Sequence, residues 1–335
     1  MIPFFFAIQH FLIVLAFFNK FGRAIFVFLS LSIFTYIYIV KPDAYDIFVY
    51  VDSVSYPFIF EPVFGFLLWS LSLVFEENRV VIFFVQATLA LLFVFLCLKV
   101  NKNNFWMALA LVLFSVSFTL SVNNILRQGF SSVFLILFVF SLIERKGWLA
   151  TFLFFLAAGF HLSSIAFGAV SLVIFLSYIF FRGRRALFRP VSPGFVLVLI
   201  LIIAGASFSF LGILLNLGFY SVYDGMVFSQ NRVPLYLKVA PIFLIFAISE
   251  FFLVRKAVSE RLELIRVLRA FFIIFTCFLA LDWRFDEIGS RILFFYFYLE
   301  LAFQLLCLNE RRFKPMLISS LGAAFALNAW NVLGG

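Results

Sequence analysis

Charge is scarce in this sequence. Only 12% of its 335 residues are charged, whereas a soluble domain carries about 25%. Apolar types make up 65% of the chain, and its mean hydropathy is +1.17. So few charged residues are not enough to cover the surface of a water-soluble fold. The composition therefore excludes a separate soluble domain and predicts an integral membrane protein.

Cysteine is also rare, and its placement excludes a disulfide framework or a cysteine-based metal site. Cys97, Cys277 and Cys307 each lie inside an apolar run, and none has C-x-x-C spacing, so we expect buried thiols. Alternation of apolar and polar residues is missing too, because the apolar runs are continuous; this indicates helices and not a β-barrel. The net charge of +9 reflects positive loops on one side of a membrane and not nucleic-acid binding.

The apolar runs predict an all-α polytopic membrane protein of a single domain. A helix needs about 17–25 residues to cross the hydrocarbon core of a bilayer. The N-terminal run lacks a basic segment before it and a small-residue cleavage site after it, so we expect it to be retained. The pattern predicts about twelve transmembrane helices, near 2–18, 24–40, 80–98, 105–121, 126–143, 148–160, 163–181, 194–217, 235–254, 270–283, 292–308 and 316–333.

The stretch 57–75 does not fit this series, because Pro57, Pro62 and Gly65 interrupt it and it carries Glu61. If this stretch enters the membrane and returns to the same side, most basic residues face one side and most acidic residues the other. By the positive-inside rule the basic side is the cytoplasm. We therefore expect a re-entrant or half helix within an outer segment 41–79, with both termini outside. The basic loops are those near residues 20–23, 99–102, 145–146, 182–189, 255–269 and 311–314.

The segment 255–269 places Val258, Leu262, Ile265 and Leu268 on one helical face with basic residues around it. This pattern predicts an amphipathic helix on the cytoplasmic surface, held by anionic lipid. A loop helix that only sets topology explains the same pattern.

The expected topology gathers unusual polar residues on the outer face. A charge at the bilayer centre costs about 2.5–3.5 kcal/mol on insertion scales, so an arginine near that depth needs a partner or a role. Each residue also has a plainer interpretation, since Arg127 reaches the headgroups easily and a lone histidine is often a packing residue. The candidates are Asp46, Glu61, Asn123, Asn124, Arg127, Gln128, His161, Arg232, Arg284 and Arg291.

Two short motifs resemble the EpsG family of exopolysaccharide and capsule membrane proteins, which are related to the Wzy-type O-antigen polymerases. The motifs are Asn124-x-x-Arg127-Gln128 and, one helix pair later, Phe160-His161-x-Ser163. The start of the broken helix at Glu61-Pro62 and the segment Arg291-x-x-x-x-Tyr296 are similar to the family as well. The resemblance spans roughly residues 40–300.

The resemblance implies a polymerase of lipid-linked oligosaccharide repeat units in the bacterial inner membrane, active on its periplasmic face. Donor and acceptor are glycans on polyprenyl (undecaprenyl) diphosphate, with a flippase or chain-length regulator as further partners. No cofactor or metal is expected, because arginines bind diphosphate oxygens. We expect Arg127, Arg291, Arg284 and Arg232 to bind the diphosphate, and His161 to act as the base, with Asp46 or Glu61 as the alternative. Asn123, Asn124 and Gln128 are expected to orient sugar hydroxyls or Arg127.

Three other interpretations remain open at this point. The first is a metal-using glycosyltransferase that takes polyprenyl-phosphate sugars. Such enzymes carry aspartates in the first outer loop, where this chain has Asp43 and Asp46. A flippase of the lipid-linked glycan needs charges along a path through the membrane, and only Glu250 and Glu300 lie within the expected helices. A membrane O-acyltransferase needs a histidine such as His161.

Overall fold

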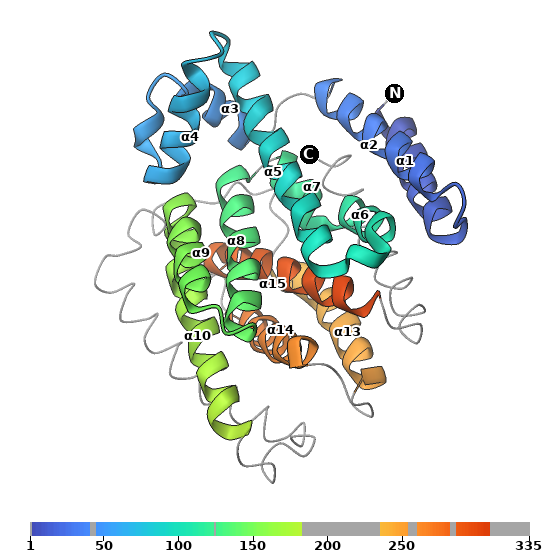
Figure 1. The fold of residues 1–335 in the computed structure, drawn as a ribbon, viewed down its shortest axis with the longest axis vertical. Coiled ribbons are helices and arrows are strands. Elements are labelled where there is room, and N and C mark those ends of the chain that lie inside the picture. The colour runs from blue at the N-terminus through green and yellow to red at the C-terminus, as the bar shows by residue number, and fades with distance from the viewer. Residues whose placement is uncertain are drawn as a thin grey trace. The chain divides into compact units, whose positions relative to one another are not determined.

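The computed structural model describes residues 2–40, 45–123, 125–182, 235–253, 260–281 and 286–308 (Figure 1). These residues form helices, with no strand among them, which confirms the all-α prediction for the described part of the chain. The helices are α1 (Ile2–Phe18), α2 (Arg23–Val40), α3 (Tyr45–Ser53), η1 (Pro57–Ile59), α4 (Pro62–Ser72), α5 (Asn78–Asn101), η2 (Lys102–Asn104), α6 (Phe105–Phe114), α7 (Val116–Asn123), α8 (Leu126–Ile143), α9 (Gly147–Phe160), α10 (Ser163–Arg182), α13 (Leu235–Leu253), α14 (Glu260–Leu279) and α15 (Asp286–Cys307).

The described residues fall into two compact units. The first holds the described residues up to Leu172, together with 260–262 and those from Phe297 onward. The second holds the described residues within 173–259 and 263–296. In the first unit α1 packs on α2, and α8 packs along α9 (Figure 1). In the second, Glu250 of α13 accepts hydrogen bonds from Arg266 and Arg269 of α14.

Three helical stretches are long and apolar enough to cross a membrane: Asn78–Phe114, Leu126–Ile143 and Ile288–Cys307. Several other apolar helices in the described ranges are shorter, so the structure does not confirm twelve spans. The expected spans 194–217 and 316–333 lie outside the described residues. The outer face of α9 is apolar, since Trp148, Phe152 and Phe155 are 92%, 59% and 66% exposed. A helix with such a face requires a lipid or protein partner.

Three of the expected helical segments have different bounds in the structure. The run 105–121 is broken at Ser115, whose backbone is extended and whose hydroxyl accepts a hydrogen bond from the backbone N–H of Phe118 at 3.1 Å. Ser115 thereby caps the start of α7 and separates it from α6. The segments 255–269 and 270–283, predicted as a surface helix and a span, are joined in the structure: no Pro or Gly separates them, and their described parts share one continuous helix, α14.

The buried side chains of α14 agree with the predicted apolar face. Leu262, Ile265 and Leu268 are all buried, and Val258 lies outside the described residues. The prediction of buried thiols is confirmed for Cys97 and Cys307, whereas Cys277 is partly exposed.

The stretch 57–75 folds as a short helix pair. Pro57 starts η1, and Pro62 starts α4 at its first position, where its missing N–H costs no hydrogen bond. The eleven residues of α4 cover about 16 Å at about 1.5 Å per residue, roughly half the thickness of the hydrocarbon core. This length agrees with the predicted half helix.

Helix α4 rests on α9 at a point where α9 has no side chain. A Cβ atom at Gly159 would clash with Cγ2 of Val63 and lie 3.0 Å from its Cβ. Gly159 therefore allows the close approach that carries Glu61, the residue before α4, to the end of α9.

Replacing Gly159 with Ala should push α4 away from α9. We expect a lower apparent Tm in detergent, because overfilling a packed contact costs about 1–3 kcal/mol. The matched control is Gly147→Ala on the same helix, where an added Cβ meets no atom within 4 Å. Equal Tm values for the two variants would contradict this close contact.

Candidate functional site

Glu61 has a side chain that is not used by its own helix. It precedes Pro62, which favours the extended backbone that Glu61 adopts (φ −58°, ψ 148°). It occupies the N-cap position of α4, yet its carboxylate makes no capping hydrogen bond there. The carboxylate is therefore available to residues far away in the sequence.

The side chains of Arg127 and His161 both contact this carboxylate. Arg127, at the start of α8, donates from Nη1 to Oε2 of Glu61 at 2.6 Å. Nδ1 of His161, just after α9, lies 2.9 Å from Oε1 of Glu61. The backbone N–H of Leu162 makes a longer contact of 3.4 Å with the same oxygen. We call Glu61, Arg127 and His161 the Glu61 cluster.

Aromatic packing fixes the ends of α8 and α9 relative to each other. Phe160, the last residue of α9, stacks on Phe130 of α8 with ring centres 4.6 Å apart and on Phe134 with centres 5.5 Å apart. The chain then leaves the helix, because His161 has an extended backbone (φ −161°, ψ 119°). His161 is held beside Arg127 by this packing as well as by Glu61.

The guanidinium of Arg127 lies in an aromatic setting. Its Cζ is 4.6 Å from the ring centre of Phe60 and 5.9 Å from that of Tyr50, which are cation–π distances. Phe64 packs against both rings. The Nε of Arg127 is buried and has no acceptor among the described residues.

Two opposing effects act on the pKa of Glu61, which precedes α4 and lies outside the three membrane-length stretches. Burial raises this pKa, but the hydrogen bond with His161 and the positive charge of Arg127 outweigh burial and lower it to about 2. The carboxylate is therefore ionised at neutral pH and can only accept hydrogen bonds. His161 consequently donates through Nδ1–H. In a neutral imidazole this leaves the lone pair on Nε2, the nitrogen turned away from Glu61.

The structure brings together three of the residues singled out from the sequence: Glu61, Arg127 and His161. Gln128 follows Arg127 on α8 and is half-buried, and Arg291 lies in α15 within the second unit. The backbones of Asp46 (α3) and Asn123 (α7) are described, but their side chains are not. Asn124, Arg232 and Arg284 lie outside the described residues.

The sequence did not indicate the bridging role of Glu61 or the aromatic partners Tyr50 and Phe60. The usable signal was a glutamate directly before a proline inside an apolar stretch. In this chain Glu61 directly precedes α4, and its carboxylate makes no capping hydrogen bond there.

The EpsG family model matches residues 43–333. This range covers most of the chain and includes the whole Glu61 cluster. The chain belongs to the EpsG family. Comparisons with curated proteins and with solved structures found no match. EpsG membership confirms the resemblance seen in the sequence and, with the apolar helices, indicates a membrane protein of polysaccharide biosynthesis.

The lowered pKa of Glu61 predicts a pH-dependent stability in this EpsG protein. Because the folded-state pKa (about 2) lies below the ordinary value of 4.5, the ionised carboxylate stabilises the fold above about pH 4.5. This contribution is lost as the pH falls from about 4.5 towards about 2. Between about pH 6 and pH 3, the apparent Tm of the wild type should fall more than that of Glu61→Gln.

The control for this measurement is Glu76→Gln, which changes an exposed carboxylate outside the Glu61 cluster. Its Tm should follow that of the wild type across the pH range. Parallel curves for the wild type and Glu61→Gln would show that the Glu61 carboxylate does not stabilise the fold through its partners.

Proposed function

We propose that this protein polymerises lipid-linked oligosaccharide repeat units of a surface polysaccharide. The observation that carries the proposal is the pairing of His161 Nδ1 with the Glu61 carboxylate at 2.9 Å, beside the guanidinium of Arg127. A histidine whose Nδ1–H is held by a carboxylate has its Nε2 lone pair directed elsewhere and fixed in orientation. This is the arrangement that a general base for a hydroxyl group needs.

The proposed reaction joins two lipid-linked glycans. The acceptor is a sugar hydroxyl on one repeat unit, and the donor is a glycan on polyprenyl diphosphate. The hydroxyl oxygen forms a bond with the anomeric carbon of the donor, and the bond from that carbon to the diphosphate oxygen breaks. The diphosphate leaves with the electron pair, and the hydroxyl proton passes to Nε2 of His161.

Glu61 acts in this proposal as a positioning residue and not as the base. Its low pKa makes its carboxylate a weak proton acceptor. Its charge instead stabilises the imidazolium that forms when His161 takes the proton. Asp46 stays the alternative base. Its side chain is not described, so this alternative stays a prediction from the sequence.

Arg127 is proposed to contact the leaving diphosphate. One of its nitrogens, Nη1, is bound to Glu61, and the buried Nε–H lacks an acceptor among the described residues. A guanidinium has five N–H groups in a planar fork, so binding Glu61 leaves others for phosphate oxygens. Because Glu61 balances the charge of Arg127, a diphosphate needs further cations, for which Arg291, Arg284 and Arg232 are the candidates. Asn123, Asn124 and Gln128 are proposed to orient sugar hydroxyls.

The same proposal places the reaction on the periplasmic face of the bacterial inner membrane. The substrates arrive on that face through a flippase, and a chain-length regulator is a further expected partner. The isoprenoid tails stay in the bilayer, next to the apolar outer surfaces of the helices.

Replacing His161 with Gln should abolish chain growth in cells. We expect gels of surface polysaccharide to show single repeat units and no ladder, because loss of a general base typically costs about 10²–10⁴ in rate. The control is His10→Gln, which changes the other of the two histidines in the chain. Immunoblots of the membrane fraction must show equal amounts of each variant.

Arg127→Lys tests the contact with diphosphate in the same assay. It keeps the charge but loses the planar fork, so we expect a rate loss of about 10²–10³. Arg145→Lys, at an exposed arginine beyond the other end of α8, should retain the ladder. A full ladder in His161→Gln or Arg127→Lys would contradict the proposal. Loss of the single repeat units as well would indicate a flippase or a glycosyltransferase of an earlier step.

A further inference from the structure

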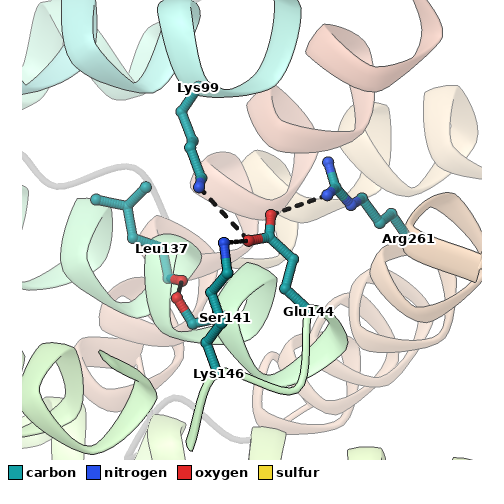
Figure 2. A network of polar contacts seen from close by, with 6 residues as sticks. All are labelled: Lys99, Leu137, Ser141, Glu144, Lys146 and Arg261. Carbon is teal, nitrogen blue, oxygen red and sulfur yellow. Dashed lines mark hydrogen bonds and ion pairs between the residues drawn. The ribbon is translucent and has the colours of Figure 1, made fainter. Parts of the chain in front are cut away.

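A second group of charges lies at the opposite end of α8 and α9 from the Glu61 cluster. Glu144, directly after α8, accepts hydrogen bonds from three cations drawn together in Figure 2. Lys146 Nζ lies 2.6 Å from Oε2, Arg261 Nη2 lies 2.8 Å from Oε1, and Lys99 Nζ is at 3.5 Å. Lys99 comes from α5 and Arg261 from the first turn of α14, and all four residues belong to the first unit. We call them the Glu144 cluster.

The turn between α8 and α9 contains two consecutive basic residues, Arg145 and Lys146. The backbone N–H of Lys146 donates to the carbonyl of Ser141, and that of Arg145 donates to the carbonyl of Leu142. This is the Schellman pattern of helix ends, in which the residue after the cap adopts a left-handed conformation. That residue is Arg145 (φ 56°) in place of the usual glycine. A strained position is thus occupied by a cation.

The charges of the Glu144 cluster do not balance. One carboxylate faces three cations, so two positive charges remain. The carboxylate side chain is only 13% exposed, whereas those of Lys99, Arg261 and Lys146 are 33%, 41% and 52% exposed. The cations therefore surround a shielded carboxylate and keep free N–H groups towards their surroundings.

Two exposed tryptophans indicate the depth of this cluster in the membrane. Trp148 lies two residues after Lys146, and Trp106 lies near the start of α6, just after η2, and both are exposed. Tryptophan concentrates at the boundary between hydrocarbon and headgroups. Arg127 and Glu144 are separated along α8 by about 26 Å at about 1.5 Å per residue, close to the thickness of the hydrocarbon core. The cluster thus lies at the headgroup level opposite the Glu61 cluster.

We propose that Lys99, Lys146 and Arg261 bind the phosphate headgroup of an anionic phospholipid from the surrounding bilayer. The phosphate supplies the second anion that the three cations lack, and Glu144 spaces them around it. Arginine and lysine differ usefully here, because Arg261 grips two oxygens at once while the lysines act as point charges. By joining residues of α5, the α8–α9 turn and α14, the bound lipid also stabilises the fold.

Purified protein in lipid nanodiscs tests this assignment. For the wild type, replacing part of the phosphatidylcholine by phosphatidylglycerol should raise the apparent Tm. Lys99→Gln/Lys146→Gln should lose most of this rise. Lys20→Gln/Lys102→Gln removes the same charge from two exposed lysines outside the cluster and should keep it. An equal loss in both double variants would overturn the site, because the effect would then come from diffuse charge.

Glu144→Gln separates a lipid site from a purely internal ion pair. Under the proposal this variant loses Tm in phosphatidylcholine and regains it when phosphatidylglycerol is added. If the cations serve only to hold Glu144, the loss is the same in both lipids and the proposal fails. Inorganic phosphate added to phosphatidylcholine nanodiscs is the third arm; a rise in Tm equal to that from phosphatidylglycerol would indicate a free-ion site and overturn the assignment to lipid.

Discussion

The candidate site depends on the carboxylate of Glu61, which is largely buried. Burying an ionised glutamate is costly unless charge and hydrogen bonds compensate it. Glu61 obtains this compensation from Arg127 and His161, which come from positions 66 and 100 residues further along the chain. Removing Glu61 leaves Arg127 without its carboxylate partner, and removing Arg127 leaves the Glu61 charge with only the contacts of His161 and Leu162. The contacts of the Glu61 carboxylate therefore join the start of α4, the start of α8 and the end of α9.

The short helix α4 and the long pair α8–α9 have different tasks in this arrangement. The pair separates two polar ends by about the thickness of the hydrocarbon core, with the Glu61 cluster at one end and the Glu144 cluster at the other. Helix α4 covers only about half that thickness and brings Glu61 to the end of α9 through the contact of Val63 with Gly159. At the end near the Glu61 cluster, the stacked rings of Phe130 and Phe160 keep the pair in register. One helix pair thus carries both a proposed reaction site and a proposed lipid site.

The sequence predicted the features that depend on local composition and on proline residues that interrupt or start helices. Long apolar runs predicted helices, and Pro62 predicted the start of the half helix, because both signals act within one segment. The break at Ser115 was missed, since a serine inside an apolar run looks like any small residue until its hydroxyl is seen to cap α7. The continuous helix α14 was divided in two, since a change from mixed to apolar composition does not end a helix. Glu61, Arg127 and His161 were each noted, but a contact across 100 residues leaves no periodic trace in a single sequence.

The central claim, that Glu61 holds the imidazole of His161 through Nδ1–H, is tested most directly by nitrogen NMR. In ¹⁵N-histidine-labelled His10→Gln protein, His161 is the remaining histidine. The spectrum is recorded at about pH 9, so that the two neutral tautomers of the imidazole are compared. The account predicts a protonated Nδ1 and an unprotonated Nε2, with the populations moving towards Nε2–H when Glu61→Gln is added. A predominantly Nε2–H tautomer that does not change with Glu61→Gln would contradict it.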